Sequence, residues 1–83
     1  MNNNHFTFEI VEHIATISEN STGNYTLELN RVSYNGAAPK LDLRKWDRLN
    51  NRMLKGITLT DSEARALSDA LLKAVIQEEP EPQ

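Results

Sequence analysis

The hydrophobic pattern of this chain changes once, at Thr60, from alternation to helical spacing. Before Thr60, apolar and polar residues alternate over four short runs, which is typical of strands. The sequence from Thr60 to Glu63 matches a capping box, with a threonine N-cap and a glutamate three residues later. The pattern therefore predicts an α+β domain in which four antiparallel strands precede one C-terminal helix ending near Ile76.

The four predicted strands differ in regularity. The first, about 6–18, and the second, about 25–34, each change the parity of their apolar residues, which predicts bulges or strong bends and hence a curved sheet. The third, about 40–46, alternates cleanly. A polar loop at 47–55 precedes a short fourth strand around Ile57 and Leu59.

The predicted helix has a wide apolar face. At roughly 100° per residue, Leu72 and Ile76 lie well to the side of the main apolar stripe. A chain of 83 residues without cysteine builds only a modest core and gains no disulfide, so self-association is the obvious supplement. We expect a homodimer through the helix, with these residues at its interface: Leu67, Leu71, Leu72, Val75 and Ile76.

The polar composition of both chain ends differs from that of the domain between them. Residues 1–5 are expected to form a flexible N-terminus, 6–76 the domain, and 77–83 a disordered acidic tail. No apolar run has membrane-spanning length, and the start lacks the basic-then-apolar order of a secretory signal. We expect a cytoplasmic protein without membrane contact.

The charge is unevenly distributed. The segment 31–55 has a net charge of +5, whereas the segments before and after it each have −4. Positive charge interleaved with aromatic rings suits a single-stranded nucleic acid, because cations meet phosphates while rings stack on bases. Seven of the nine basic residues lie in this segment: Arg31, Lys40, Arg44, Lys45, Arg48, Arg52 and Lys55.

The third strand turns part of this segment into a face. Leu41 and Leu43 share one parity, whereas Lys40, Asp42, Arg44 and Trp46 share the other. A tryptophan is commonly a core residue, but burying this one would bury its charged neighbours, and unpaired buried charge is costly. We therefore expect the aliphatic side to face inward and Trp46 to be exposed.

Enzymatic chemistry is not indicated. The three glycines form no phosphate loop, and His5 and His13 have neither a nearby nucleophile nor a second cluster of metal ligands. Asp42 and Asp47 lie among cations and do not resemble an acid/base pair. We expect no enzyme, no metal and no cofactor.

Three segments in order resemble a known family. They are Arg31 to Gly36 (RVSYNG), Lys40 to Trp46 (KLDLRKW) and Lys55 to Thr60 (KGITLT), followed by the acidic-capped helix. Together they resemble the single-stranded-DNA-binding domain of the transcriptional coactivator positive cofactor four, in particular its bacterial YdbC-like branch. The resemblance covers about 6–76 and implies a β-β-β-β-α fold that dimerises through its helix and binds single-stranded DNA in grooves of the curved sheets.

The resemblance also assigns residues. Tyr34 stands where the family has a base-stacking aromatic before a glycine turn, while Trp46, Arg44 and Lys55 match its tryptophan, strand cation and pre-glycine lysine. Asn35 departs from the lysine of the eukaryotic members. The predicted DNA-binding residues are Arg31, Tyr34, Lys40, Arg44, Trp46, Arg52 and Lys55; Lys45 and Arg48 are lesser candidates.

The leading hypothesis is a homodimer that binds single-stranded DNA with little sequence preference, in transcription regulation, replication or repair at the bacterial nucleoid. About four or five phosphate contacts would give a log–log salt slope near −3, at roughly 0.7 per contact. Two alternatives remain open: RNA as the ligand, and a protein-interaction module whose basic face docks on an acidic partner such as RNA polymerase.

Overall fold

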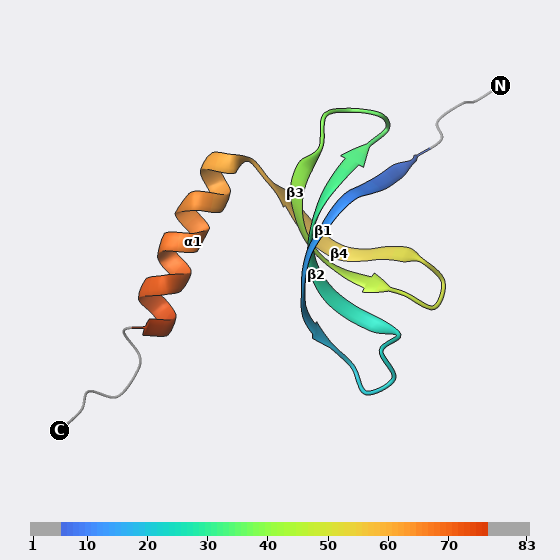
Figure 1. Cartoon of the computed structure of the whole chain (residues 1–83), viewed down its shortest axis with the longest axis horizontal. Helices are drawn as coiled ribbons and strands as arrows, with labels where there is room; N and C mark the ends of the chain where they lie inside the picture. Colours follow the sequence, from blue (N-terminus) through green and yellow to red (C-terminus); the bar gives the residue numbers. More distant parts are fainter. Residues whose placement is uncertain (1–5, 77–83) are drawn as a thin grey trace.

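The computed structural model describes residues 6–76 as one antiparallel sheet followed by one helix (Figure 1). The sheet order is β1-β2-β3-β4, which confirms the predicted α+β architecture. The predicted flexible terminus at 1–5 and acidic tail at 77–83 lie outside the described residues. The elements are β1 (Phe8–Glu19), β2 (Tyr25–Tyr34), β3 (Lys40–Asp47), β4 (Arg52–Leu59) and α1 (Asp61–Ile76).

Strand β1 is irregular along its whole length. Its pairing with β2 shifts register three times, and each shift skips one β-branched residue: Val11, Ile14 and Ile17. Each skipped residue is the extra residue of a bulge, which bends the strand and increases its twist. The parity change in the sequence correctly predicted an irregularity at the first of these positions.

The β2–β3 turn agrees with the prediction from the sequence, whereas the start of β4 does not. Asn35 and Gly36 both have positive φ, and the N–H of Ala37 donates to the carbonyl of Tyr34, so a tight turn begins the β2–β3 connection. The fourth strand was predicted too short, because it begins at Arg52 rather than near Ile57. A register shift in its pairing with β3 hides its alternation in the sequence.

The sheet curls along its strands so strongly that side chains beside opposite ends of β2 come into contact. Phe8 pairs with Tyr34 and Trp46 pairs with Thr26, and these two β2 residues would be about 26 Å apart in a flat strand at ~3.3 Å per residue. The ring centroids of Phe8 and Trp46 are nevertheless 5.4 Å apart. The face that carries them is therefore concave.

The core lies in this concavity, which corrects the predicted orientation of β3. Trp46 and Asp42 are fully buried, whereas Leu41 and Leu43 are only half-buried on the convex face. The expectation of an exposed Trp46 was therefore wrong. Because the sheet curls, the side chains of its concave face are enclosed by the sheet itself. Ion pairs among these side chains reduce the free-energy cost of burying their charges.

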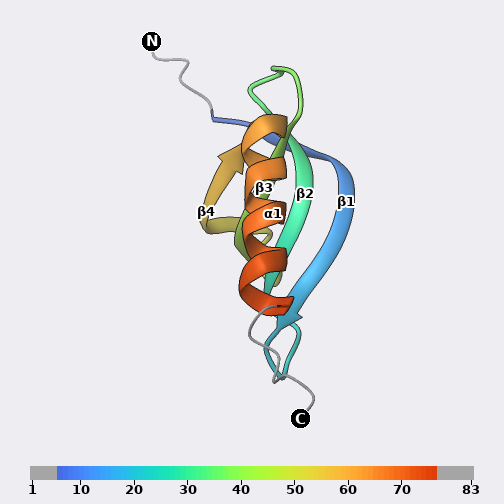
Figure 2. The ribbon, with the colours of Figure 1, turned by 90° about the vertical axis from the view of Figure 1, so that its left-hand side faces the viewer.

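Helix α1 lies against the convex face but leaves it mostly open. Thr60 and Glu63 exchange the two backbone-to-side-chain hydrogen bonds of the predicted capping box, at 2.9 and 3.0 Å. Within the described chain only β3 and β4 approach the helix closely, and none of its residues is buried. Figure 2 shows the helix in front of the sheet. No helix among residues 6–76 is long and apolar enough to cross a membrane.

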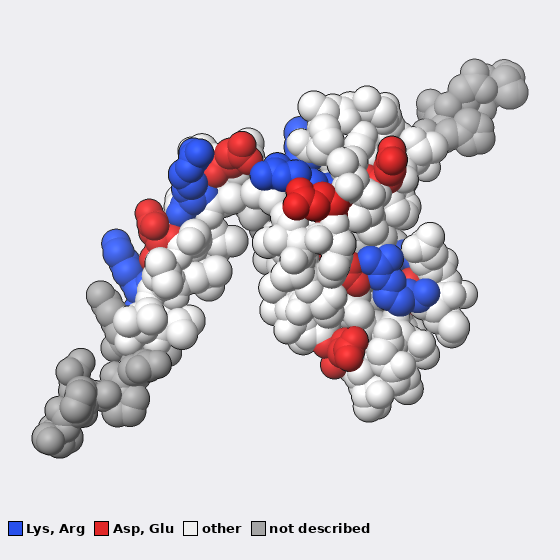
Figure 3. Space-filling view, in the orientation of Figure 1, with Lys and Arg blue, Asp and Glu red and all other residues white. Residues whose placement is uncertain are grey.

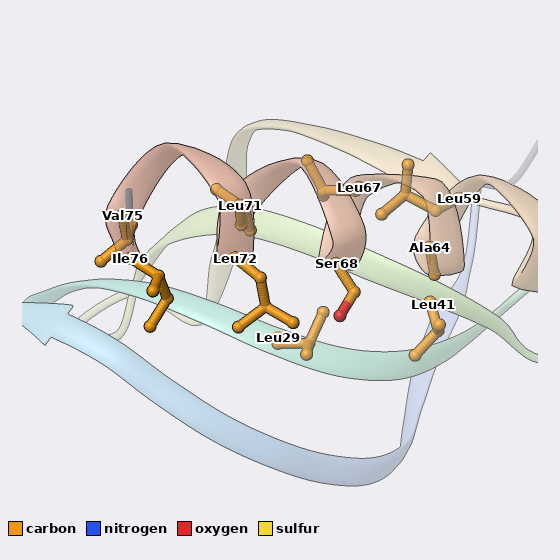
Figure 4. Close-up of a pocket in the computed structure, with 10 residues that line it drawn as sticks. All are labelled: Leu29, Leu41, Leu59, Ala64, Leu67, Ser68, Leu71, Leu72, Val75 and Ile76. Atoms are coloured by element: carbon orange, nitrogen blue, oxygen red, sulfur yellow. The ribbon is translucent and has the colours of Figure 1, made fainter. Parts of the chain in front are cut away.

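An apolar groove of about 420 Å³ separates the helix from the convex face. Leucines from three strands and an apolar row along the helix line it (Figure 4). The helical lining includes all five residues predicted for a dimer interface, and four of these are more than half exposed in the single chain. Those four are Leu71, Leu72, Val75 and Ile76.

Gly56 is required where β4 pairs with Arg44 of β3. A Cβ at this position would lie 2.5 Å from Cβ of Arg44 and 2.6 Å from the carbonyl oxygen of Leu43. We expect Gly56→Ala to lower the free energy of unfolding by about 1–3 kcal/mol, because β3 must shift to accept the methyl group. Urea unfolding followed by circular dichroism measures the change.

Gly36→Asn is the matched control. Gly36 has φ of +78° with open space around it, and asparagine tolerates that conformation. Its effect should be clearly smaller than that of Gly56→Ala. Equal stabilities of the Gly56→Ala variant and the original protein would contradict the close approach of the two strands.

Candidate nucleic-acid interface

The first polar cluster of the concave face is centred on Asp42. Its carboxylate accepts hydrogen bonds from the hydroxyl of Tyr34 and from Nε and Nη2 of Arg44, the last at 2.9 Å. Nη1 of Arg44 donates to the carbonyl of Leu54 at 2.8 Å. The hydrogen bonds with Asp42 raise the pKa of Arg44. The pKa of Tyr34 is also raised, mainly by burial and secondly by the hydrogen bond to Asp42. Arg44 is thus committed to an internal partner.

The second cluster is centred on Glu28. The carboxylate is buried and accepts from Nε and Nη2 of Arg48 at 2.8 and 2.5 Å, and also from Thr26 and Asn30. His13 joins the cluster through Nδ1, 2.6 Å from Oδ1 of Asn30. Burial alone would raise the pKa of Glu28, but these hydrogen bonds outweigh it and lower the pKa to about 2.

Two groups cover Trp46. Phe8 packs on it at a tilt of 53°, and the guanidinium carbon of Arg48 lies 4.6 Å from the ring centroid. Its Nε1–H has no acceptor among the described residues. Because the ring is fully buried, the expected stacking of bases directly on Trp46 does not fit this arrangement.

Other aromatic rings are accessible at the mouth of the concavity, by which we mean the end of the concave face that carries Phe6, Tyr34 and Lys40. Phe6 is 62% exposed and lies 6.0 Å from Tyr34, ring centroid to ring centroid. Phe8 continues the row, 6.3 Å from Phe6. Lys40, on the same face as Val32, is exposed and has no carboxylate within 4 Å in the described part of the chain.

Phe6 and Phe8 were not identified from the sequence as candidate site residues. Both were interpreted only as alternating strand residues. The sequence does show that Phe6 and Phe8 alternate with Ile10 and therefore lie on one face of the strand. Which face meets Tyr34 follows only from the pairing register.

The remaining predicted cations do not join this mouth. Arg31 lies toward the convex side, 3.7 Å from Glu12 and 3.9 Å from Asp61 at the start of the helix. Lys55 lines a hollow on the convex side with Lys45. Arg52 is exposed at the β3–β4 hairpin, 3.8 Å from Asp47.

Charge on the visible surface is mixed rather than uniformly basic. In Figure 3, cations and acids alternate along the helix and over the sheet, and the surfaces that border the space between helix and sheet are largely uncharged. The structure thus places Tyr34, Lys40 and Arg44 on one face of the sheet and Arg31 on the other. Lys55 lines the convex hollow, which Arg44 also borders.

The depressed pKa of Glu28 predicts a pH-dependent stability. A carboxylate with folded pKa near 2, below its ordinary 4.5, stabilises the fold above pH 4.5, and this stabilisation is lost as pH falls toward 2. We expect Glu28→Gln to cost about 2–3 kcal/mol at pH 7 and progressively less below pH 4.5. Urea unfolding of both proteins between pH 2 and 7 measures this difference, and a constant difference would contradict it.

Comparison with known proteins places the chain beside one relative of unassigned role. No protein-family model matches the sequence. An uncharacterized protein of Treponema pallidum (strain Nichols) is 39% identical over 69 residues, which covers 83% of this chain and 80% of that protein. At this identity and coverage, the chain belongs to the same family as the Treponema pallidum protein.

Proposed function

We propose that the protein is a homodimer that binds single-stranded DNA with little sequence preference at the mouth of the concave face. The observation that carries the proposal is the row of accessible aromatic rings, Phe6 and Tyr34, on the same face as the exposed Lys40. The role is binding rather than catalysis.

The chemistry of this mouth suits unpaired bases. An exposed ring offers a flat apolar surface to any base, and a nearby ammonium group attracts the phosphate that follows it. Tyr34 is held rigidly, because its hydroxyl is bonded to Asp42 and Arg44. A fixed ring loses little conformational freedom on binding, which favours affinity.

The order of elements is compatible with the positive cofactor four family, whose YdbC-like branch the sequence resembles. That resemblance supports single-stranded DNA as the ligand and transcription, replication or repair at the nucleoid as the setting. It also supports an association with the transcription machinery. These assignments remain proposals for this chain.

The apolar groove supports the dimer. A helix with no buried residue and a row of half-exposed leucines is unusual for an isolated chain, since apolar surface exposed to water costs free energy. A second copy would offer the same row of side chains and could cover both grooves at once. The concave mouths would then stay open on the outside of the dimer.

Binding of single-stranded DNA is tested by fluorescence anisotropy of labelled oligo(dT). We expect saturable binding at low salt and a log–log salt slope clearly shallower than −3, at roughly 0.7 per phosphate. The slope is shallower because Arg44 is paired inside the fold, and because Arg31 and Lys55 lie away from the mouth. No binding by the folded protein would overturn the proposal, and tighter binding of RNA or of an acidic protein would favour the alternatives.

Phe6→Ala tests the aromatic row. Loss of one stacked base should weaken oligo(dT) binding by about tenfold, since stacking contributes ~1–3 kcal/mol per base. Ile17→Ala is the control, because Ile17 is similarly exposed but lies near the opposite end of β1. Equal affinities of the two variants would remove Phe6 from the site.

Leu72→Glu tests the dimer. A carboxylate in the apolar groove would be desolvated by a second chain, so the molar mass from light scattering should fall from dimer to monomer at micromolar concentration. Ala66→Glu, also on the helix but outside the groove lining, should remain dimeric. A monomeric original protein would refute self-association.

A further inference from the structure

Arg48 is a partly exposed arginine that covers the buried tryptophan of the concave face. Its guanidinium carbon Cζ lies over the ring of Trp46, 4.6 Å from the ring centroid. Its side chain is 30% exposed, whereas Trp46 is fully buried beneath it. Arg48 therefore covers the buried indole while part of its own side chain stays accessible to solvent.

The hydrogen-bonding edge of Arg48 is already occupied. Nε and Nη2 donate to the two oxygens of Glu28, and Nη1 makes only a long contact of 3.4 Å with Oδ1 of Asn51. An arginine binds phosphate or carboxylate tightly through a paired edge, and here that edge is used. The adjacent carboxylate also offsets its charge, so Arg48 is poorly suited as a phosphate ligand.

The surrounding turn holds the guanidinium in this position. The N–H of Arg48 donates to the carbonyl of Asn24 at 2.6 Å, and the side chain of Asp47 accepts from the N–H of Asn50 at 3.1 Å. Asn51 completes the turn with a φ of 53°. The guanidinium is thus held through its backbone, through its hydrogen bonds to Glu28 and through its contact with Trp46.

We propose that the outer face of the Arg48 guanidinium is a base-stacking platform for the nucleic acid. Bases stack on guanidinium planes as they do on aromatic rings. Trp46 and Glu28 would act as positioning residues, which orient the plane without touching the ligand. The inference rests on the proposed function and moves the base contact expected at Trp46 to the arginine that covers it.

The test compares two ligands that differ only in their bases. Arg48→Lys keeps a cation opposite Glu28 but removes the plane. Its binding to oligo(dT) should weaken by about tenfold, while its binding to an abasic strand of the same length should stay unchanged. Arg52→Lys is the matched control, because Arg52 lies on the same hairpin, is 68% exposed and should show no such difference between ligands.

The outcomes separate this inference from the proposed function. Equal loss on both ligands, or no loss, would overturn the platform while leaving single-strand binding intact. Failure of the original protein to bind oligo(dT) would overturn both.

If Arg48→Lys does not fold, base stacking on Arg48 can be tested by a measurement on the original protein. The Nε–H of Arg48 is held by Glu28, so its proton should exchange slowly and give an NMR signal. A base stacked on the plane should shift this signal upfield with oligo(dT) but not with the abasic strand. The same position with both ligands would overturn the platform.

Discussion

Two arginine–carboxylate pairs inside the curled sheet are the interactions on which the rest of the structure depends. Arg44 with Asp42 and Arg48 with Glu28 each place a charged group on the concave face, where both carboxylates are buried. A sheet that curls on itself must enclose whatever its inner face carries. Because each buried carboxylate is matched by an arginine and by further hydrogen bonds, the inner face is enclosed without an unpaired charge in these clusters.

This pairing reduces the number of cations in the segment 31–55 that are available to a ligand. Composition counts every arginine as a cation available to a partner, but two of the seven basic residues are engaged with buried carboxylates. Arg31 lies near acids of β1 and the helix, and Arg52 lies near Asp47. The proposed binding surface therefore depends more on flat groups held in place than on net positive charge.

Local signals in the sequence predicted the order of elements well. The capping box at Thr60 and the turn at Asn35 and Gly36 depend on near neighbours, and both formed as expected. The early start of β4 could not be predicted, because its bulge depends on how β3 pairs with it.

The site was predictable only in part, for a similar reason. Tyr34, Lys40 and Arg44 share a face that alternation along two strands makes visible. The exposure of Trp46 was predicted wrongly because its cover comes from Phe8, 38 positions away, and from an arginine beyond the strand. Alternation assigns a side to each residue but does not say which side is enclosed when a sheet curls.

The three bulges of β1 have a consequence for the behaviour of the protein in a crowded cell. β1 is an edge strand with exposed apolar side chains at Val11, Ile14 and Ile17, a composition that invites aggregation with the edges of other chains. Each bulge interrupts the regular spacing of backbone groups that a foreign strand would need to extend the sheet. The irregularity that bends β1 around the core thus also protects its open edge from templating a fibril.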